Sequence, residues 1–267
     1  MIPVELYDYI SKRKSVRQYD DRPLDIRAIS EILEFVGKAE PLHKEIKKEI
    51  QVVSKDEINV FLPVRSPHYL MMTSEPREGY LENAGFLLQQ IDLFLSSKGY
   101  GSCYVGMALP SKEARSMSEL EYVIVLAFGR PAEPLHRTEP SEFKRKPLPE
   151  IADLSELMED IDSFDAVTDI MDSVRLAPSA TNGQPWYMVP DTGRLDFYCV
   201  KPGFIKSIGY RKMNRIDMGA ALCHCSLAAE HAGIPSEFIF DSEAQKRCPK
   251  DYYYTGTILL NQAGTAR

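Results

Sequence analysis

Four cations and a hydroxyl lie close together near the N-terminus, in the sequence KRKSVR at residues 12–17. Arginine offers a planar fork of N–H donors that matches phosphate oxygens, lysine offers a point charge, and serine adds a hydroxyl. These residue types can therefore clamp one phosphate group. Basic residues also gather at the C-terminal ends of helices, where they complement the helix dipole and are simply solvated. Taken alone, the cluster leaves both interpretations open.

A second segment with chemical potential is APSATNGQPW at residues 177–186, which contains the only tryptophan of the chain. Pro178 ends the helix expected before it, and the small residues allow the backbone to approach a flat ligand. The side chains of Ser179, Asn182 and Gln184 can supply hydrogen bonds. The same composition is also common in ordinary helix-to-strand connections with Asx turns, so this loop too has two interpretations.

The charge balance limits the partners of the chain. Lys and Arg number 32 against 39 Asp and Glu, a net charge of −7, so no global positive field exists to attract nucleic acid or anionic lipid. The longest apolar run, Tyr122 to Phe128, is far shorter than the roughly 20 residues that span a bilayer. In the first residues, MIPVELYDYISKRK, the bases follow the apolar residues, the reverse of a signal peptide. We expect a cytoplasmic protein with neither nucleic-acid nor membrane partners.

The five cysteines are odd in number and show no CxxC spacing, so we expect reduced thiols rather than a disulfide framework. Cys223, His224 and Cys225 with His231 suggest a metal site. In a helix, however, residues two positions apart point about 200° away from each other, so the two thiols cannot share one tetrahedral ion. We predict core thiols here and no metal site.

Hydrophobic spacing and capping residues predict the elements that must position the two segments. Asp25 is expected to cap a helix whose apolar stripe is Ile26, Ile29, Leu33 and Val36, and Gly99 is expected to end a long helix. Helices are predicted near residues 4–14, 25–37, 82–98, 165–176 and 214–231, with an acidic connecting helix at 150–165. Extended segments are predicted at 51–53, 59–62, 68–73, 101–106, 121–128, 186–189, 195–200, 237–240 and 252–260.

The same ground plan occurs twice along the chain, once before and once after the acidic segment. A diverged internal duplication explains this recurrence, and two unrelated α+β stretches are the alternative. The acidic segment places the division between residues 1–150 and residues 151–267.

Taken together and in this order, the two segments resemble the nitroreductase family of FMN-dependent oxidoreductases. RKSVRQY is similar to the family's N-terminal phosphate motif, and APSATNGQPW to the loop that a partner subunit lays along the isoalloxazine in an intertwined dimer. YLENAGFLLQQIDLFLSSKGYGSCYVG resembles the central helix and the loop after it, and FKRKPLPEI the basic C-terminal motif. The resemblance implies an α+β, nitroreductase-like fold with antiparallel-rich sheets.

The resemblance also implies FMN as cofactor and assigns its contacts. Arg13, Lys14 and Ser15 would meet the phosphate and ribityl end, and Arg17 the pyrimidine edge, where a cation stabilises the reduced flavin. Isoalloxazine contacts would come from Cys103, Tyr104, Val105 and Gly106 near N5 and O4, and from Pro178, Ser179, Ala180, Asn182 and Gln184 of the second half. Arg145 or Lys146 would complete the phosphate cage, and the sequence leaves that choice open.

The order of the motifs departs from the family pattern. The APS loop follows the first half, where GKAEPL at residues 37–42 stands in its place, and the second half has no Arg-Lys-Ser cluster. This resembles a fused, single-chain version of the family dimer, in a subgroup with an NRIDMG helix, here residues 214–219. We therefore expect two diverged halves that form an intramolecular pseudo-dimer, one FMN per chain and a protein that works as a monomer.

The resemblance implies hydride transfer from NAD(P)H through FMN to an electron-poor acceptor such as a nitroaromatic or a quinone. One flavin face serving both substrates implies ping-pong kinetics. No acid-base pair of side chains is required, because the cofactor carries the chemistry. The alternative is a flavin-binding or flavin-free protein without enzymatic activity, decayed from a nitroreductase.

Overall fold

The computed structural model describes residues 2–155, 161–203 and 207–261. The chain forms two compact units. Unit 1 contains residues 2 and 11–142, and unit 2 contains residues 3–10 with the described part of 143–261. The division therefore falls between residues 142 and 143, and the short segment 3–10 packs with the second unit.

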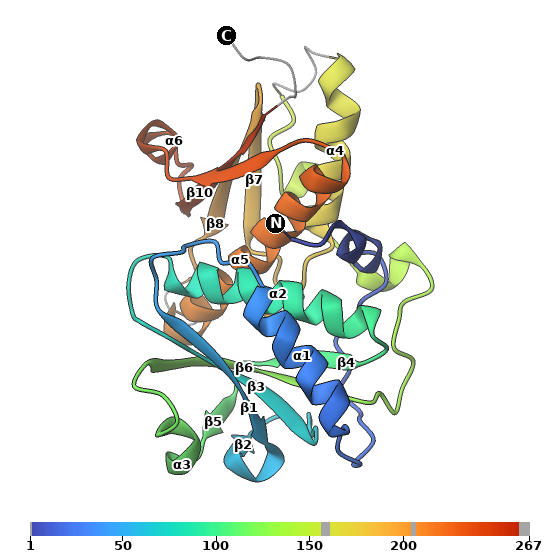
Figure 1. The fold of residues 1–267 in the computed structure, drawn as a ribbon. Helices are drawn as coiled ribbons and strands as arrows, with labels where there is room; N and C mark the ends of the chain where they lie inside the picture. The colour runs from blue at the N-terminus through green and yellow to red at the C-terminus, as the bar shows by residue number, and fades with distance from the viewer. Residues whose placement is uncertain (1, 156–160, 204–206, 262–267) are drawn as a thin grey trace. The chain divides into compact units, whose positions relative to one another are not determined.

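Unit 1 is built on a four-stranded antiparallel sheet with the order β1-β3-β6-β4. Its strands are β1 (Lys48–Ser54), β3 (His68–Ser74), β6 (Glu121–Gly129) and β4 (Gly101–Val105). Helix α2 (Tyr80–Ser97) packs on this sheet, and α1 (Ile26–Lys38) packs on α2 (Figure 1). A two-stranded ribbon of β2 (Ile58–Val60) and β5 (Ala108–Pro110) and the short α3 (Lys112–Arg115) complete the unit.

The predicted cap of α1 is confirmed, because the Asp25 carboxylate accepts a hydrogen bond of 2.9 Å from Ala28 N. The predicted apolar stripe is wrong. Ala28, Ile32 and Phe35 are buried, whereas Ile26 is 86% exposed. The Phe35 ring stacks on Phe94 of α2 with centroids 4.0 Å apart, and this contact fixes which face of α1 turns inward.

Helix α2 is the core of unit 1, since every residue from Leu81 to Ser96 is buried. It ends as predicted at Gly99, which has a φ of 81° and lets Tyr100 N donate to Leu95 O at 2.9 Å. Polar side chains are buried along this helix too, among them Gln90 and Asp92. Buried polar groups need partners, so these side chains must bind neighbouring segments.

Unit 2 repeats the plan of unit 1. Its antiparallel sheet has the order β7-β8-β10-β9, from β7 (Trp186–Asp191), β8 (Arg194–Val200), β10 (Tyr252–Leu260) and β9 (Ser236–Ile239). Helix α5 (Ser207–His231) packs on this sheet, and α4 (Ile161–Arg175) packs on α5. The short α6 (Ser242–Lys246) contacts β10.

The two units share one topology. In chain order each has a helix, two strands, a long helix and two more strands, and in each sheet the last strand lies between the second and the third. The helix pair α1 and α2 thus corresponds to α4 and α5, and β1, β3, β4 and β6 correspond to β7, β8, β9 and β10. The α+β class expected from the sequence is confirmed, and the matched topology supports the inferred duplication.

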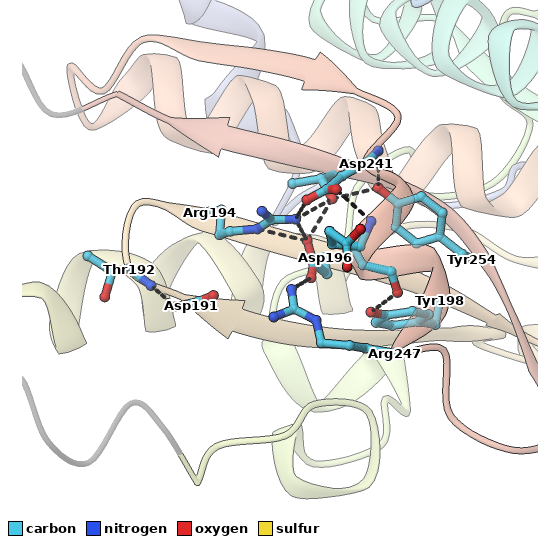
Figure 2. Close-up of polar contacts among 11 residues, drawn as sticks. Asp191, Thr192, Arg194, Asp196, Tyr198, Asp241, Arg247 and Tyr254 are labelled. Atoms are coloured by element: carbon cyan, nitrogen blue, oxygen red, sulfur yellow. Dashed lines mark hydrogen bonds and ion pairs between the residues drawn. The ribbon is translucent and has the colours of Figure 1, made fainter.

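A buried carboxylate ties the strands of unit 2 to the segment around α6 (Figure 2). Asp196 on β8 is 1% exposed and accepts hydrogen bonds from Arg194 (2.6 Å), Thr257 (2.6 Å) and Arg247 (3.2 Å). Arg194 also pairs with Asp241, the residue that caps α6. The two arginines and two aspartates balance, so this cluster is a structural network.

Two helix predictions need correction. Residues 4–14 form only the 3-10 helix η1 (Val4–Tyr9), whose Tyr7 ring stacks on His231 of α5 at 3.8 Å. The predicted acidic helix does not begin at residue 150. The 3-10 helix η4 (Leu148–Glu150) ends there, and residues 151–155 are non-helical because Ala152 pairs with Met188 beside β7. Residues 156–160 of that prediction lie outside the described residues, and α4 begins at Ile161.

Candidate functional site

The basic segment 13–17 runs in extended form beside the first residues of β4. Ser15 pairs with Ser102 in parallel, and Val16 N donates to Ser102 O at 2.9 Å. Glycine at position 101 permits this approach, since a Cβ there would lie 2.7 Å from the Cβ of Val16. Unit 1 therefore brings together the two segments that the sequence assigned to phosphate and to flavin N5.

Arg13 is the most deeply buried member of the basic segment, with 2% of its side chain exposed. Its Nε lies 2.9 Å from Asp92 Oδ2 of α2, and its Nη2 donates to Ser15 Oγ at 3.2 Å. Ser102 Oγ donates to the second oxygen of Asp92. The ion pair is thus dry and hydrogen-bonded, the condition under which a buried charge is tolerated. Its partner Asp92 was not singled out from the sequence, although an aspartate within the apolar run LLQQIDLFL is a usable signal.

Lys14 and Arg17 are held by Glu133. One Glu133 oxygen accepts hydrogen bonds from the backbone N–H groups of Arg17 (2.6 Å) and Gln18 (3.2 Å), and the other lies 3.4 Å from Lys14 Nζ. Burial opposes ionisation of Glu133, but these N–H groups and the Lys14 ammonium hold the pKa of its carboxyl below the ordinary value. The Arg17 side chain is exposed and donates only to Ser15 O, at 3.3 Å. Sequence analysis did not identify Glu133.

The segment 103–106 forms the end of β4 and the turn after it. Cys103 and Val105 are buried, while the Tyr104 hydroxyl donates to Gln89 Oε1 of α2 at 3.3 Å. Burial raises the pKa of the Cys103 thiol, and the charges of Arg17 and Arg13 offset this only in part. The thiol is therefore not activated as a nucleophile. Gly106 lies in the turn after β4 and is exposed, so backbone is accessible to a ligand there.

In unit 2, the loop after α4 is held in an unusual backbone conformation. Thr181, Asn182 and Gln184 have φ values of 53°, 58° and 50°, in the left-handed region that non-glycine residues rarely adopt. Such residues cost on the order of 1 kcal/mol or more each and persist only where their surroundings hold them. Within the loop, Gln184 N donates to Ser179 Oγ at 2.9 Å.

The predicted basic motif at residues 145–146 lies against this loop. Arg145 donates to Asn182 Oδ1 and to the carbonyl oxygens of Leu176 (3.1 Å) and Ala177 (2.7 Å). Lys146 N donates to Gln184 Oε1 at 2.8 Å, and its exposed ammonium lies 3.4 Å from Gly183 O. The structure thus joins residues that are more than thirty positions apart in the sequence and that the resemblance assigned to one cofactor.

A buried carboxylate of α5 supports the same loop. Asp217 Oδ2 accepts a hydrogen bond of 3.0 Å from Ala180 N. Burial raises the pKa of the Asp217 carboxyl to about 8, and the Ala180 N–H opposes only part of the rise. Asp217 lies within the NRIDMG sequence, but sequence reasoning gave this residue no role of its own. In unit 1, the corresponding long helix holds the corresponding segment with an amide, because Gln90 bonds both the N–H (3.0 Å) and the C=O (2.7 Å) of Glu40.

The histidine and cysteines of α5 are core residues. His224 is fully buried and its Nδ1 lies 2.9 Å from Ser173 O of α4, while Cys223 and Cys225 are buried as well. Within the described ranges, no three His, Cys, Asp or Glu side chains are grouped as a metal site requires. No helix in the described part of the chain is long and apolar enough to cross a membrane.

Comparison with known families places this arrangement. A sequence model of a family described as "Putative TM nitroreductase" matches residues 5–229. The chain belongs to this nitroreductase family. The match covers most of both units, and membership supports an oxidoreductase. No curated protein matches the chain.

Solved structures show the same fold as this nitroreductase. The structure of a "putative nitroreductase" from Thermotoga maritima has a TM-score of 0.64 and 23% identity, and the match covers 96% of this chain and 94% of that one. A nitroreductase family protein from Clostridium novyi NT (TM-score 0.41, 20% identity) covers 48% of this chain with 86% of its own. An FMN-dependent nitroreductase from Clostridium difficile R20291 (TM-score 0.40, 16% identity) covers 50% with 92% of its own.

Proposed function

We propose that this nitroreductase is an FMN-dependent oxidoreductase that passes hydride from NAD(P)H to an electron-poor acceptor such as a nitroaromatic or a quinone. The proposal depends mainly on the hydrogen bond between Val16 N and Ser102 O. This bond holds the basic segment beside β4, so phosphate donors and exposed backbone at Gly106 belong to one rigid part of unit 1.

The residues present fit FMN in their chemistry. Lys14 and Arg17 supply positive charge in an otherwise acidic chain, and Ser15 supplies a hydroxyl. In unit 2, the loop 178–184 offers small residues and amides of the kind that contact a flat ring, and Lys146 offers an exposed ammonium. When bound, FMN supplies the hydride carrier that links NAD(P)H to the acceptor.

The proposed task of the side chains is to bind and orient. Lys14, Ser15 and Lys146 bind the phosphate, and Arg17 stabilises negative charge at the pyrimidine edge. Ser179 and Asp217 fix the loop that contacts the ring, through Gln184 N and Ala180 N. Because nothing here assigns an acid-base pair, NAD(P)H and the acceptor use the same position in turn, which gives ping-pong kinetics.

We propose further that the two units are the halves of a fused pseudo-dimer that retains one complete set of motifs. The basic cluster occurs only in unit 1 and the APS loop only in unit 2. The chain then binds one FMN and works as a monomer. Light scattering combined with flavin quantitation on the same sample tests this. Two flavins per chain, or loss of flavin on dissociation of a dimer, would contradict it.

Initial-rate kinetics test the activity. FMN-loaded protein is assayed with NADH or NADPH against a nitroaromatic and a quinone, and parallel double-reciprocal lines are expected. Intersecting lines would contradict the shared position.

A specific observation favours the second candidate function, a decayed protein without activity. Arg13 is already committed to Asp92, and Arg145 to backbone carbonyls, so two of the cations that the resemblance assigned to phosphate are engaged elsewhere. Absence of turnover by the FMN-loaded protein across a broad acceptor panel would support that candidate.

A further inference from the structure

The guanidinium of Arg145 is occupied by the protein itself. Its Nη1 donates to Phe143 O at 2.9 Å and to Asn182 Oδ1, and its Nη2 donates to Leu176 O at 3.1 Å and Ala177 O at 2.7 Å. The two terminal nitrogens carry four N–H bonds, and four acceptors surround them. A phosphate could reach this fork only by displacing one of these acceptors.

Two of the acceptors are carbonyl groups just beyond the end of α4. Leu176 and Ala177 follow Arg175, the last residue of the helix, and the carbonyl groups at such an end have no partner within the helix. A cation there also complements the negative end of the helix dipole. Arg145 thus closes the end of α4 at the point where the APS loop begins.

The other partner of interest, Asn182, lies at the strained part of the loop, with a φ of 58°. Its side chain is held at both ends, because Oδ1 accepts from Arg145 and Nδ2 donates to Lys144 O at 2.9 Å. Lys144 is itself in the left-handed region, with a φ of 51°. Two unusual backbone segments, far apart in sequence, therefore hold each other in place.

We infer that Arg145 is a positioning residue that locks the loop 179–184 in its strained conformation, and that Lys146 is the base of this pair that serves an anionic ligand. Lys146 uses its backbone N–H for Gln184, but its ammonium is exposed and has a contact of 3.4 Å with Gly183 O. This resolves the choice between Arg145 and Lys146 that the sequence left open. The role of the loop toward flavin rests on the proposed function, whereas the lock itself does not.

Hydrogen exchange of the full chain without added flavin tests the lock directly. Arg145→Ala is expected to raise exchange at the amides of residues 180–184 by about tenfold or more, because the loop loses three of its anchors at once. Arg145→Lys is expected to behave nearly the same, since an ammonium cannot reproduce the fork. Lys146→Ala is the matched control and should leave this exchange unchanged. Unchanged exchange in Arg145→Ala would overturn the inference.

A second variant guards against global unfolding in Arg145→Ala. Asn182→Gly removes the side chain that Arg145 binds while allowing the positive φ. It should loosen the same amides, and its effect should be smaller in the Arg145→Ala background, because the two residues share one interaction. Fully additive effects of the two substitutions would contradict the lock.

Titration with FMN separates this inference from the proposed function. Arg145→Ala should weaken FMN binding with an unchanged salt dependence, whereas Lys146→Ala should weaken binding and reduce the salt dependence. Reduced salt dependence in Arg145→Ala, with affinity retained in Arg145→Lys, would show that Arg145 binds the phosphate. If the wild-type chain binds no FMN, the proposed function fails, and the exchange measurement still decides the lock.

Discussion

Arg13 and Asp92 form an ion pair that is almost completely buried, with Nε and Oδ2 2.9 Å apart and side-chain exposures of 2% and 1%. The pair connects the basic segment to the middle of the most buried helix of unit 1. Removing one partner of such a pair leaves an uncompensated charge in a region of low polarity, whereas removing both can be nearly neutral. The basic segment is thus built into the core of the unit.

Asp92→Asn is expected to lower the free energy of unfolding by roughly 3 kcal/mol, because Arg13 then remains charged and unpaired. The double variant with Arg13→Met should recover much of this loss. Urea denaturation of both proteins checks the prediction, and Arg22→Ala, which removes a highly exposed cation, is the control. An Asp92→Asn protein as stable as wild type would show that the pair contributes little.

Gly101→Ala is expected to destabilise the protein by about 1 to 3 kcal/mol, because the added Cβ would lie 2.7 Å from Val16 and push the basic segment away from β4. In a Val16→Gly background the same substitution should cost almost nothing. Gly37→Ala in α1 is the matched control, since a Cβ there meets no atom within 4 Å, and it should stabilise slightly. An equal cost of Gly101→Ala in both backgrounds would rule out the proposed clash.

Asp217→Asn should change how stability depends on pH. The folded pKa of about 8 lies above the ordinary value of 3.8, so the native state holds a proton that the unfolded chain releases. The contribution of this group is therefore present at low pH and is lost as the pH rises from about 4 to 8, at up to about 1.4 kcal/mol per pH unit. Relative to wild type, Asp217→Asn should gain stability as pH rises over this range.

Unfolding measurements from pH 5 to pH 8 check this expectation. Glu237→Gln, which removes an exposed carboxylate on β9, is the control and should follow wild type throughout. A constant difference between Asp217→Asn and wild type across the range would mean that the carboxyl is not held protonated.

Arg17→Ala is expected to weaken FMN binding about three- to tenfold at low ionic strength and less at high ionic strength, because its exposed guanidinium acts through a screened charge. Flavin fluorescence titrations at several salt concentrations measure this. Arg22→Ala, five residues away and also exposed, should bind FMN like wild type. Equal affinity of Arg17→Ala and wild type at every salt concentration would remove Arg17 from the site.

Much of the fold could be predicted from local signals. Asp25 and Gly99 mark helix ends because capping depends on a few adjacent residues, and β10 has the predicted bounds because its apolar run is continuous. The buried face of α1 was mispredicted because it depends on the contact with Phe94, which no local pattern contains. The failure of the acidic helix at residues 150–155 has a similar cause, the pairing of Ala152 with Met188.

The candidate site shows the same division between local and distant information. The sequence identified the basic segment and the APS loop, whose residue types suggest ligand chemistry on their own. It missed Asp92, Glu133 and Asp217, single carboxylates whose roles come from partners in distant segments. It also could not choose between Arg145 and Lys146, because adjacent bases differ only in which neighbours the fold gives them.

The central claim is that this nitroreductase carries a flavin that NAD(P)H reduces and an electron-poor acceptor reoxidises. Anaerobic absorbance spectroscopy of the FMN-loaded protein tests it most directly. Addition of NADH or NADPH should bleach the flavin absorbance near 450 nm, on the order of one equivalent per chain, and a nitroaromatic or quinone added afterwards should restore it. A bound flavin that stays oxidised with both nucleotides would contradict the account.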